Sequence, residues 1–141
     1  MILVVDTNIL FSYFKKESVA HLMIQSSVAR FVSPEFALIE LKKHAPEIRR
    51  KAFLSPKAFN TMRLELTSFV EFLPLETYAK ELKKAVAVSP DPDDCDFFAV
   101  ALSLKAPLWS NDRALKQQQH LPVFSTQDLL NHSAFEGLFG H

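Results

Sequence analysis

Glycine is almost absent from this sequence, and its two glycines, Gly137 and Gly140, lie among the last five residues. Loops of the Walker or dinucleotide-binding type need glycines so that the backbone can approach a phosphate closely. Neither kind of loop can be placed in the first 136 residues. The scarcity of glycine therefore excludes the common nucleotide-binding loops.

Cysteine is equally scarce, and neither sign of charge is in excess. Cys95 is the one cysteine, which excludes an internal disulfide and a zinc site built from several cysteines. Sixteen basic and sixteen acidic residues cancel, so a nucleic acid would have to be bound by a local basic patch rather than by the overall field. A chain without disulfides suits a reducing compartment, and we expect a cytoplasmic protein.

Long hydrophobic runs are missing as well. The N-terminal apolar run stops at Asp6 and has no basic segment before it, so we expect no signal peptide. The longest later run, 97–104, is far too short to cross a bilayer, and we expect no membrane partner. The chain of 141 residues, 48% of them hydrophobic, is long enough for one domain that buries roughly two thirds of its unfolded surface.

Short apolar runs alternate with helical patterns along the chain. Runs of four to eight apolar or β-branched residues between turn signals are typical of buried strands. The expected strands are Ile2–Val5, Phe31–Ser33, Phe69–Leu73, Leu108–Ser110 and Val123–Phe124. This alternation predicts an α/β fold, a three-layer α/β/α sandwich with a central parallel sheet covered by helices on both faces.

Serine and proline mark where the helices should begin. Serine followed by proline provides an N-cap and a favourable first helical residue. The expected starts are Ser33-Pro34 before Glu35, Ser55-Pro56 before Lys57, Pro92 before Asp93, and Ser125 before Thr126. We also expect Pro46 to break or kink the long helical stretch that begins at Pro34.

Four segments place carboxylates where a strand ends or a helix begins. Asp6 follows the first strand directly, Asp112 follows the fourth, and Glu40 lies in the helical stretch after Pro34; a cluster holds Asp91, Asp93, Asp94 and Asp96. Ligand sites in parallel α/β sheets lie beyond the carboxyl ends of the strands, and a buried acid there needs a cation, a donor or a metal. Two plainer interpretations stay open: Asp6 can cap the next helix, and the cluster can complement a helix dipole.

Helical spacing helps to choose among these acids. Asp94 shares a face with residues 97, 98 and 101, which is the apolar stripe of the helix, whereas Asp96 shares a second face with 99, 100 and 103. Asp93 faces inward less consistently. Glu40 shares a face with Phe36 and Lys43, so we expect it to be partly buried and partly accessible.

Acids that converge at one end of a sheet repel each other and need hard cations. Mg²⁺ takes oxygen ligands and keeps several waters. Such a site can activate a water molecule and neutralise charge that builds on a phosphodiester, as metal-dependent nucleases do. Asn8 and Ser110 could orient the carboxylates by hydrogen bonds, and Asp96 is assigned to the same supporting group.

Four of these segments together resemble the PIN-domain ribonucleases. They are VVDTNIL at 4–10, SPE at 33–35 leading to Glu40-Leu41, DDCDFFAVAL at 93–102, and APLWSND at 106–112. Each segment alone is weak, but the four in this order and at these separations are quite specific. The resemblance runs from residue 2 to about 130, nearly the whole chain.

The resemblance implies a PIN-like fold over 1–131, followed by a C-terminal tail at 132–141. It implies that Asp6, Glu40, Asp94 and Asp112 are catalytic, that Asp6, Asp94 and Asp112 bind Mg²⁺ or Mn²⁺, and that single-stranded RNA is cut. Ser110 stands where the family often has threonine. Many compact members are VapC-type toxins, which are dimeric and silenced by a small antitoxin, so a homodimer and an antitoxin partner are expected.

Two further features of the sequence and two rival functions bear on this interpretation. Lys42, Lys43, Arg49 and Arg50 follow Glu40 and could guide RNA to the acids, or form a solvated helix face. The apolar tail at 135–141 could dock on a partner or fray. A phosphatase of the haloacid-dehalogenase type would need aspartate where Asn8 stands. A PIN-like module that binds RNA or protein without cutting is the second rival.

Overall fold

The centre of the fold is a sheet of five parallel strands in the order β3-β2-β1-β4-β5. The computed structural model describes residues 1–138. The strands are β1 Ile2–Val5, β2 Arg30–Pro34, β3 Val70–Leu73, β4 Leu108–Trp109 and β5 Val123–Phe124. Each coincides within two residues with a predicted strand, and the predicted α/β class with a parallel sheet is confirmed. Because β1 is central, the residue that follows it lies at the middle of one sheet edge.

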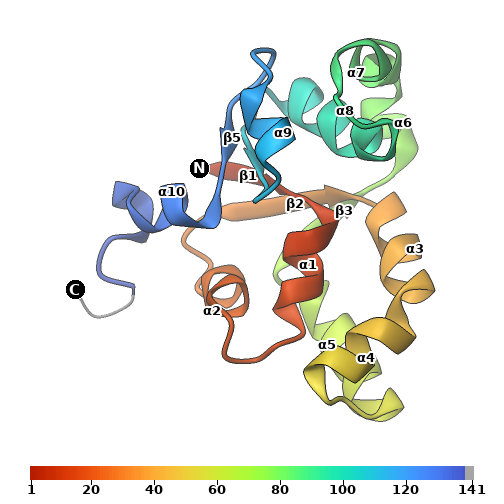
Figure 1. Ribbon diagram of the computed structural model, residues 1–141, viewed down its shortest axis with the longest axis vertical. Helices are drawn as coiled ribbons and strands as arrows, with labels where there is room; N and C mark the ends of the chain where they lie inside the picture. The colour runs from red at the N-terminus through yellow and green to blue at the C-terminus, as the bar shows by residue number, and fades with distance from the viewer. Residues whose placement is uncertain (139–141) are drawn as a thin grey trace.

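Helices cover both faces of this sheet (Figure 1). On one face lies α8, which contacts β1, β2 and β4, together with the shorter α6 and α7. On the other lie α1 and α2, with α3, α4 and α5 forming a lobe beside α1 (Figure 1). The helices are α1 Thr7–Tyr13, α2 Val19–Gln25, α3 Phe36–Lys43, α4 Ala45–Ala52, α5 Pro56–Leu66, α6 Leu75–Tyr78, α7 Leu82–Val88, α8 Cys95–Leu104, α9 Arg113–Gln117 and α10 Thr126–Leu130.

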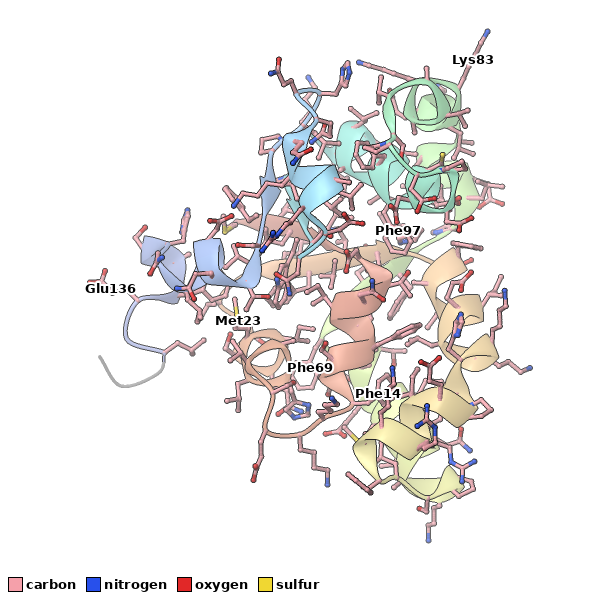
Figure 2. The ribbon with its side chains drawn as sticks, viewed as in Figure 1. Phe14, Met23, Phe69, Lys83, Phe97 and Glu136 are labelled. Carbon is pink, nitrogen blue, oxygen red and sulfur yellow. The ribbon has the colours of Figure 1, made fainter. Side chains whose placement is uncertain are left out.

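The core fills the space between these layers. Phe97 of α8 is 2% exposed and lies against the sheet, whereas Phe14, at the end of α1, stacks on Phe59 of α5 with ring centroids 4.8 Å apart (Figure 2). Trp109 of β4 is fully buried, and its Nε1 donates a hydrogen bond to Thr126 Oγ1 at 3.0 Å. Most of α8 is buried, as expected for a helix that is apolar on nearly every side.

Two serines begin helices as predicted, and Pro46 separates two others. Ser55 accepts a hydrogen bond from the Ala58 amide, and Ser125 forms a capping box with Asp128. The chain leaves α3 at His44 and starts α4 at Ala45, so Pro46 occupies the second position of α4. A proline has no N–H to donate to the carbonyl four residues earlier, so α3 cannot continue through it.

The predicted helix start at Ser33-Pro34 is wrong. Both residues belong to β2, and α3 begins at Phe36 after Glu35. The Ser33 hydroxyl donates a hydrogen bond to the Val5 carbonyl of β1 at 2.7 Å, and the Glu35 amide donates to the Leu73 carbonyl of β3. The serine side chain therefore joins β2 to β1 instead of capping a helix. Its hydrogen-bond partner lies 28 positions away in the sequence.

Replacing Ser33 with alanine should weaken this junction. Ser33 is fully buried, and losing its hydrogen bond to Val5 should lower the free energy of unfolding by about 1–2 kcal/mol. Urea denaturation measures this directly. The exposed Ser68 provides a matched control, because Ser68→Ala should change stability by less than about 0.5 kcal/mol. Equal stabilities for the two variants would show that the Ser33 hydroxyl contributes nothing.

Candidate active site

Two acids lie side by side at one edge of the sheet because their strands pair. Val5 of β1 is in register with Trp109 of β4, and the Asp6 amide donates to the Trp109 carbonyl at 3.2 Å. Asp6 follows β1, and Asp112 follows β4 after Ser110 and Asn111. Both acids therefore stand beyond the carboxyl ends of adjacent parallel strands, where α/β proteins place their ligand sites.

Asp6 is both a helix cap and a buried acid. Its Oδ1 accepts a hydrogen bond from the Ile9 amide at 2.9 Å, and the residue is 5% exposed. The pKa of this carboxyl is raised to about 6, chiefly by burial and to a smaller extent by the charge of Asp112. Hydrogen bonds from the Ser110 side chain and the Ile9 amide oppose that rise. Asp6 therefore caps α1 and is at the same time a buried acid.

Asp94 stands at the start of α8, which lies on the opposite face of the sheet from α1. It occupies the N-cap position of α8, and within the described residues its side chain makes no capping hydrogen bond. The pKa of Asp94 is raised to about 7, chiefly by burial and then by the charges of Asp91, Asp6, Asp112 and Asp93. The influence of Asp6 and Asp112 means that three acids from three separate elements lie within electrostatic reach of one another.

Ser110 and Asp112 complete this edge. Ser110 is 1% exposed, and its Oγ accepts a hydrogen bond from the Asp112 amide at 3.1 Å. Asp112 in turn caps α9, since its Oδ1 accepts from the Ala114 amide at 2.8 Å. Ser110 therefore contacts the loop of Asp112 and also lies close enough to the Asp6 carboxyl to lower its pKa.

Glu40 lies on α3 and faces a cavity beside Asp94. The cavity measures about 510 Å³, and its wall includes Glu40, Asp93, Asp94 and the exposed Asn8. Glu40 Oε2 lies 3.3 Å from His44 Nε2, one helical turn further along. The structure therefore brings Glu40 and Asn8 to the same hollow as Asp94, whereas Asp6 and Asp112 are not part of its wall.

Asp96 points to a different neighbour. Its Oδ2 accepts a hydrogen bond from the Tyr78 hydroxyl of α6 at 2.6 Å. Burial of Tyr78, together with this bond and the charge of Asp96, raises the tyrosine pKa well above its usual value. Asp96 thus anchors α6 to the start of α8, and any support that it gives to Asp94 passes through the position of that helix.

The four basic residues predicted to bind RNA lie on different surfaces of the protein. Lys43 lines the cavity beside Asp94. Lys42 and Arg49 line a separate groove of about 500 Å³ between α3, α4 and α5, and Arg50 is exposed on α4. Two cavity residues, Phe11 and Phe36, were not assigned to the site from the sequence. Their helical spacing could have indicated them, because Phe11 lies one turn after Asn8 and Phe36 lies one turn before Glu40.

The donors at this edge suit a hard divalent cation in their chemistry. Asp6, Asp94 and Asp112 offer only carboxylate oxygens, and none of the three forms an ion pair with a basic side chain in residues 1–138. Uncompensated acids with raised pKa values are the environment that Mg²⁺ or Mn²⁺ relieves. As oriented, however, no three His, Cys, Asp or Glu side chains among the described residues converge on one ion position.

The fold and this edge define the class of protein, a parallel α/β domain with carboxylates clustered beyond its central strands. The family model for the PIN domain matches residues 4–129, and the chain belongs to the PIN-domain family. The predicted resemblance and the PIN-like three-layer fold are confirmed. Within the described residues, no helix combines the length and apolarity that a bilayer crossing requires.

One solved structure illustrates the likeness in fold. The crystal structure of VapBC2 from Rickettsia felis bound to a DNA fragment from their promoter contains a chain that superposes with a TM-score of 0.65. The two chains share 17% sequence identity over 89% of this chain and 98% of that one. Among curated proteins, no sequence matches this chain.

Proposed function

We propose that this protein is a Mg²⁺- or Mn²⁺-dependent endoribonuclease that hydrolyses single-stranded RNA. The observation that carries the proposal is that Asp6 and Asp112 follow two adjacent parallel strands, β1 and β4, while Asp94 begins α8 close enough for both charges to contribute to its raised pKa, after burial and Asp91. Membership of the PIN-domain family supports the same activity. The expected products carry a 5′-phosphate and a 3′-hydroxyl.

In this proposal each acid has a definite task. Asp6, Asp94 and Asp112 hold the cation, which when bound would neutralise phosphodiester charge and activate water. Ser110 and the Ile9 amide keep the Asp6 carboxylate in place. Glu40 faces the cavity beside Asp94, where its Oε2 can accept a proton from the attacking water. Asn8 and Lys43 face the same cavity and can bind the RNA backbone.

Cleavage of a labelled single-stranded RNA by the purified full chain tests the proposal. Cutting is expected with Mg²⁺ or Mn²⁺ and should disappear with EDTA, because the acids then lack the cation that offsets their charge. Single-stranded DNA and duplex RNA of the same sequence serve as substrate controls. Cutting that is unaffected by EDTA, or absent for several unrelated RNAs while the protein binds Mn²⁺, would contradict the proposal.

A PIN-like module that binds RNA or protein without cutting is the alternative function. One observation favours it, namely that no three potential ligands among the described residues converge on one ion position. Calorimetric titration with Mn²⁺ separates the two functions without an activity assay. Failure to bind Mn²⁺ at millimolar concentration would favour the module.

We also propose the setting of a toxin–antitoxin pair. The support is the fold that this chain shares with a chain of the VapBC2 structure. In this setting the protein would be a cytoplasmic homodimer that a small antitoxin silences. The nuclease domain would occupy 1–131, with a tail at 132–141. In that tail Phe135 is 2% exposed and packs into the protein's own core, and residues 139–141 lie outside the described part of the chain.

A further inference from the structure

The cavity beside the acids has an aromatic wall as well as an acidic one. Phe11 of α1 and Phe36 of α3 line it together with Glu40 and Asp94. Both phenylalanines are half-buried, with one side packed against the core and the other facing the cavity. The ring of His44 lies near Phe11, with centroids 5.4 Å apart and planes inclined by 55°. Flat apolar surface and acid groups thus share one hollow.

This hollow continues between α1 and α4 into a second one. The second cavity measures about 270 Å³ and shares Asn8, Phe11, Glu47 and Lys51 with the first. Lys15 lies in the wall of the second cavity, Lys43 in the wall of the first, and Lys51 in both. Helices α1 and α4 both contribute residues to the wall of the second cavity. The path therefore leads from Asp94 past an aromatic ring towards Lys15 and Lys51, of which Lys51 forms an ion pair with Glu47 at 2.8 Å.

These features together fit one kind of ligand, a single strand of nucleic acid. Aromatic side chains stack on unpaired bases of any identity, while cations alongside bind the phosphates. The larger cavity, about 510 Å³, falls within the size range of ordinary ligand pockets, about 300–1,000 Å³. A base in a duplex cannot present its flat face in this way, because its neighbours already cover it. An aliphatic wall would accept apolar groups of any shape and would not favour a planar one.

We propose that Phe11 and Phe36 form a stacking subsite for one unpaired nucleobase next to the phosphate that is cut. This inference rests on the proposed nuclease function and adds to it how the substrate is held. It explains a preference for single-stranded RNA through this chain's own residues, since the base must leave a stack before it can enter the cavity. Lys51 and Lys15 then bind the next phosphates along the path.

Binding of a short single-stranded RNA that contains 2-aminopurine tests the subsite without any cleavage. The fluorescence of 2-aminopurine falls when it stacks on an aromatic ring, so quenching is expected on adding the full chain with EDTA present. Phe11→Leu and Phe36→Leu should each weaken binding about tenfold, as the loss of one stacked ring does elsewhere. Phe11→Tyr should keep binding within about threefold, because the ring remains.

Phe69→Leu is the matched control, because Phe69 is also a half-buried phenylalanine packed on the core but lies outside both cavities. It should bind the RNA as the unaltered protein does. If Phe11→Leu and Phe36→Leu bind the RNA as tightly as the control while melting at the same temperature, the subsite is refuted. If Phe11→Leu is destabilised, the RNA affinities of Phe36→Leu and Phe11→Tyr test the subsite instead.

Cleavage kinetics separate a failure of this inference from a failure of the nuclease proposal. In an active enzyme, loss of the subsite should raise KM about tenfold and change kcat by less than about threefold. Active protein with an unchanged KM in both leucine variants would refute the subsite and leave the nuclease proposal standing. Base quenching by a chain that cuts no RNA would support the subsite and overturn the nuclease proposal.

Discussion

Asp94→Asn should abolish metal-dependent RNA cleavage, lowering kcat by at least about a thousandfold. A bound divalent ion contributes several kcal/mol to a phosphoryl-transfer transition state, and each 1.36 kcal/mol corresponds to tenfold in rate. Asparagine is nearly the same shape as aspartate but carries no charge, so the loss would reflect the carboxylate rather than packing. Single-turnover cleavage of a labelled RNA at saturating Mn²⁺ measures the effect, and circular dichroism checks the fold.

The neighbouring Asp93 provides the matched control. It lines the same cavity as Asp94 but is exposed, and Asp93→Asn should reduce kcat by less than about tenfold. Mn²⁺ affinity should fall strongly in Asp94→Asn and little in Asp93→Asn. The opposite ranking of the two variants would move the third acid of the site to Asp93. Full activity in both would remove this helix start from the site.

The stability of the protein should decrease as the pH rises from about 4 to 7.5. The folded state holds the pKa of Asp6 at about 6 and of Asp94 at about 7, against a usual value of 3.8. Below pH 3.8 both acids are protonated in both states, so this stability is fully present. As the pH rises, the unfolded chain releases its protons first and gains stability relative to the fold until the pH passes the folded pKa. For the buried Asp6 the pKa difference between the folded and unfolded states corresponds to about 3 kcal/mol of lost stability. The pKa difference of the half-buried Asp94 is larger, but its contribution to stability is reduced because solvent screens its charge.

Asp6→Asn tests this origin of the pH dependence. Asparagine keeps an oxygen for the Ile9 amide but removes the buried charge, so the variant should be more stable than the unaltered protein at pH 7.5 and nearly equal to it at pH 4. Urea denaturation at the two pH values measures the difference. Adding Mn²⁺ at pH 7.5 should stabilise the unaltered protein far more than the variant, because the cation offsets the same charge.

Asp128 is a suitable control for this experiment. The Lys116 ammonium beside it lowers the pKa of Asp128, so its contribution to stability is present above the unfolded pKa and is lost at lower pH. Asp128→Asn should therefore leave the decrease between pH 4 and 7.5 in place. A decrease that persists unchanged in Asp6→Asn would assign it to groups other than Asp6.

Local patterns in the sequence were enough to predict the strands and the edge at which the acids gather. An apolar run such as Ile2–Val5 specifies a buried strand wherever it packs, and an acid directly after it must lie at the strand's carboxyl end. The helix caps at Ser55 and Ser125 were also predictable, since a cap is a contact between residues three positions apart. The same holds for the break at Pro46, which follows from a missing N–H.

The sequence by itself thus determined the class of fold, the PIN-domain family and the approximate place of the acids. Only the tertiary structure decided which partners the polar side chains take. The Ser33 hydroxyl donates to the Val5 carbonyl instead of capping α3, Asp96 accepts from Tyr78, and Phe11 and Phe36 line the same cavity. Each of these contacts joins residues far apart in the chain. The energy of such a contact depends on where the sheet and its helices bring two distant segments together, which no local pattern contains.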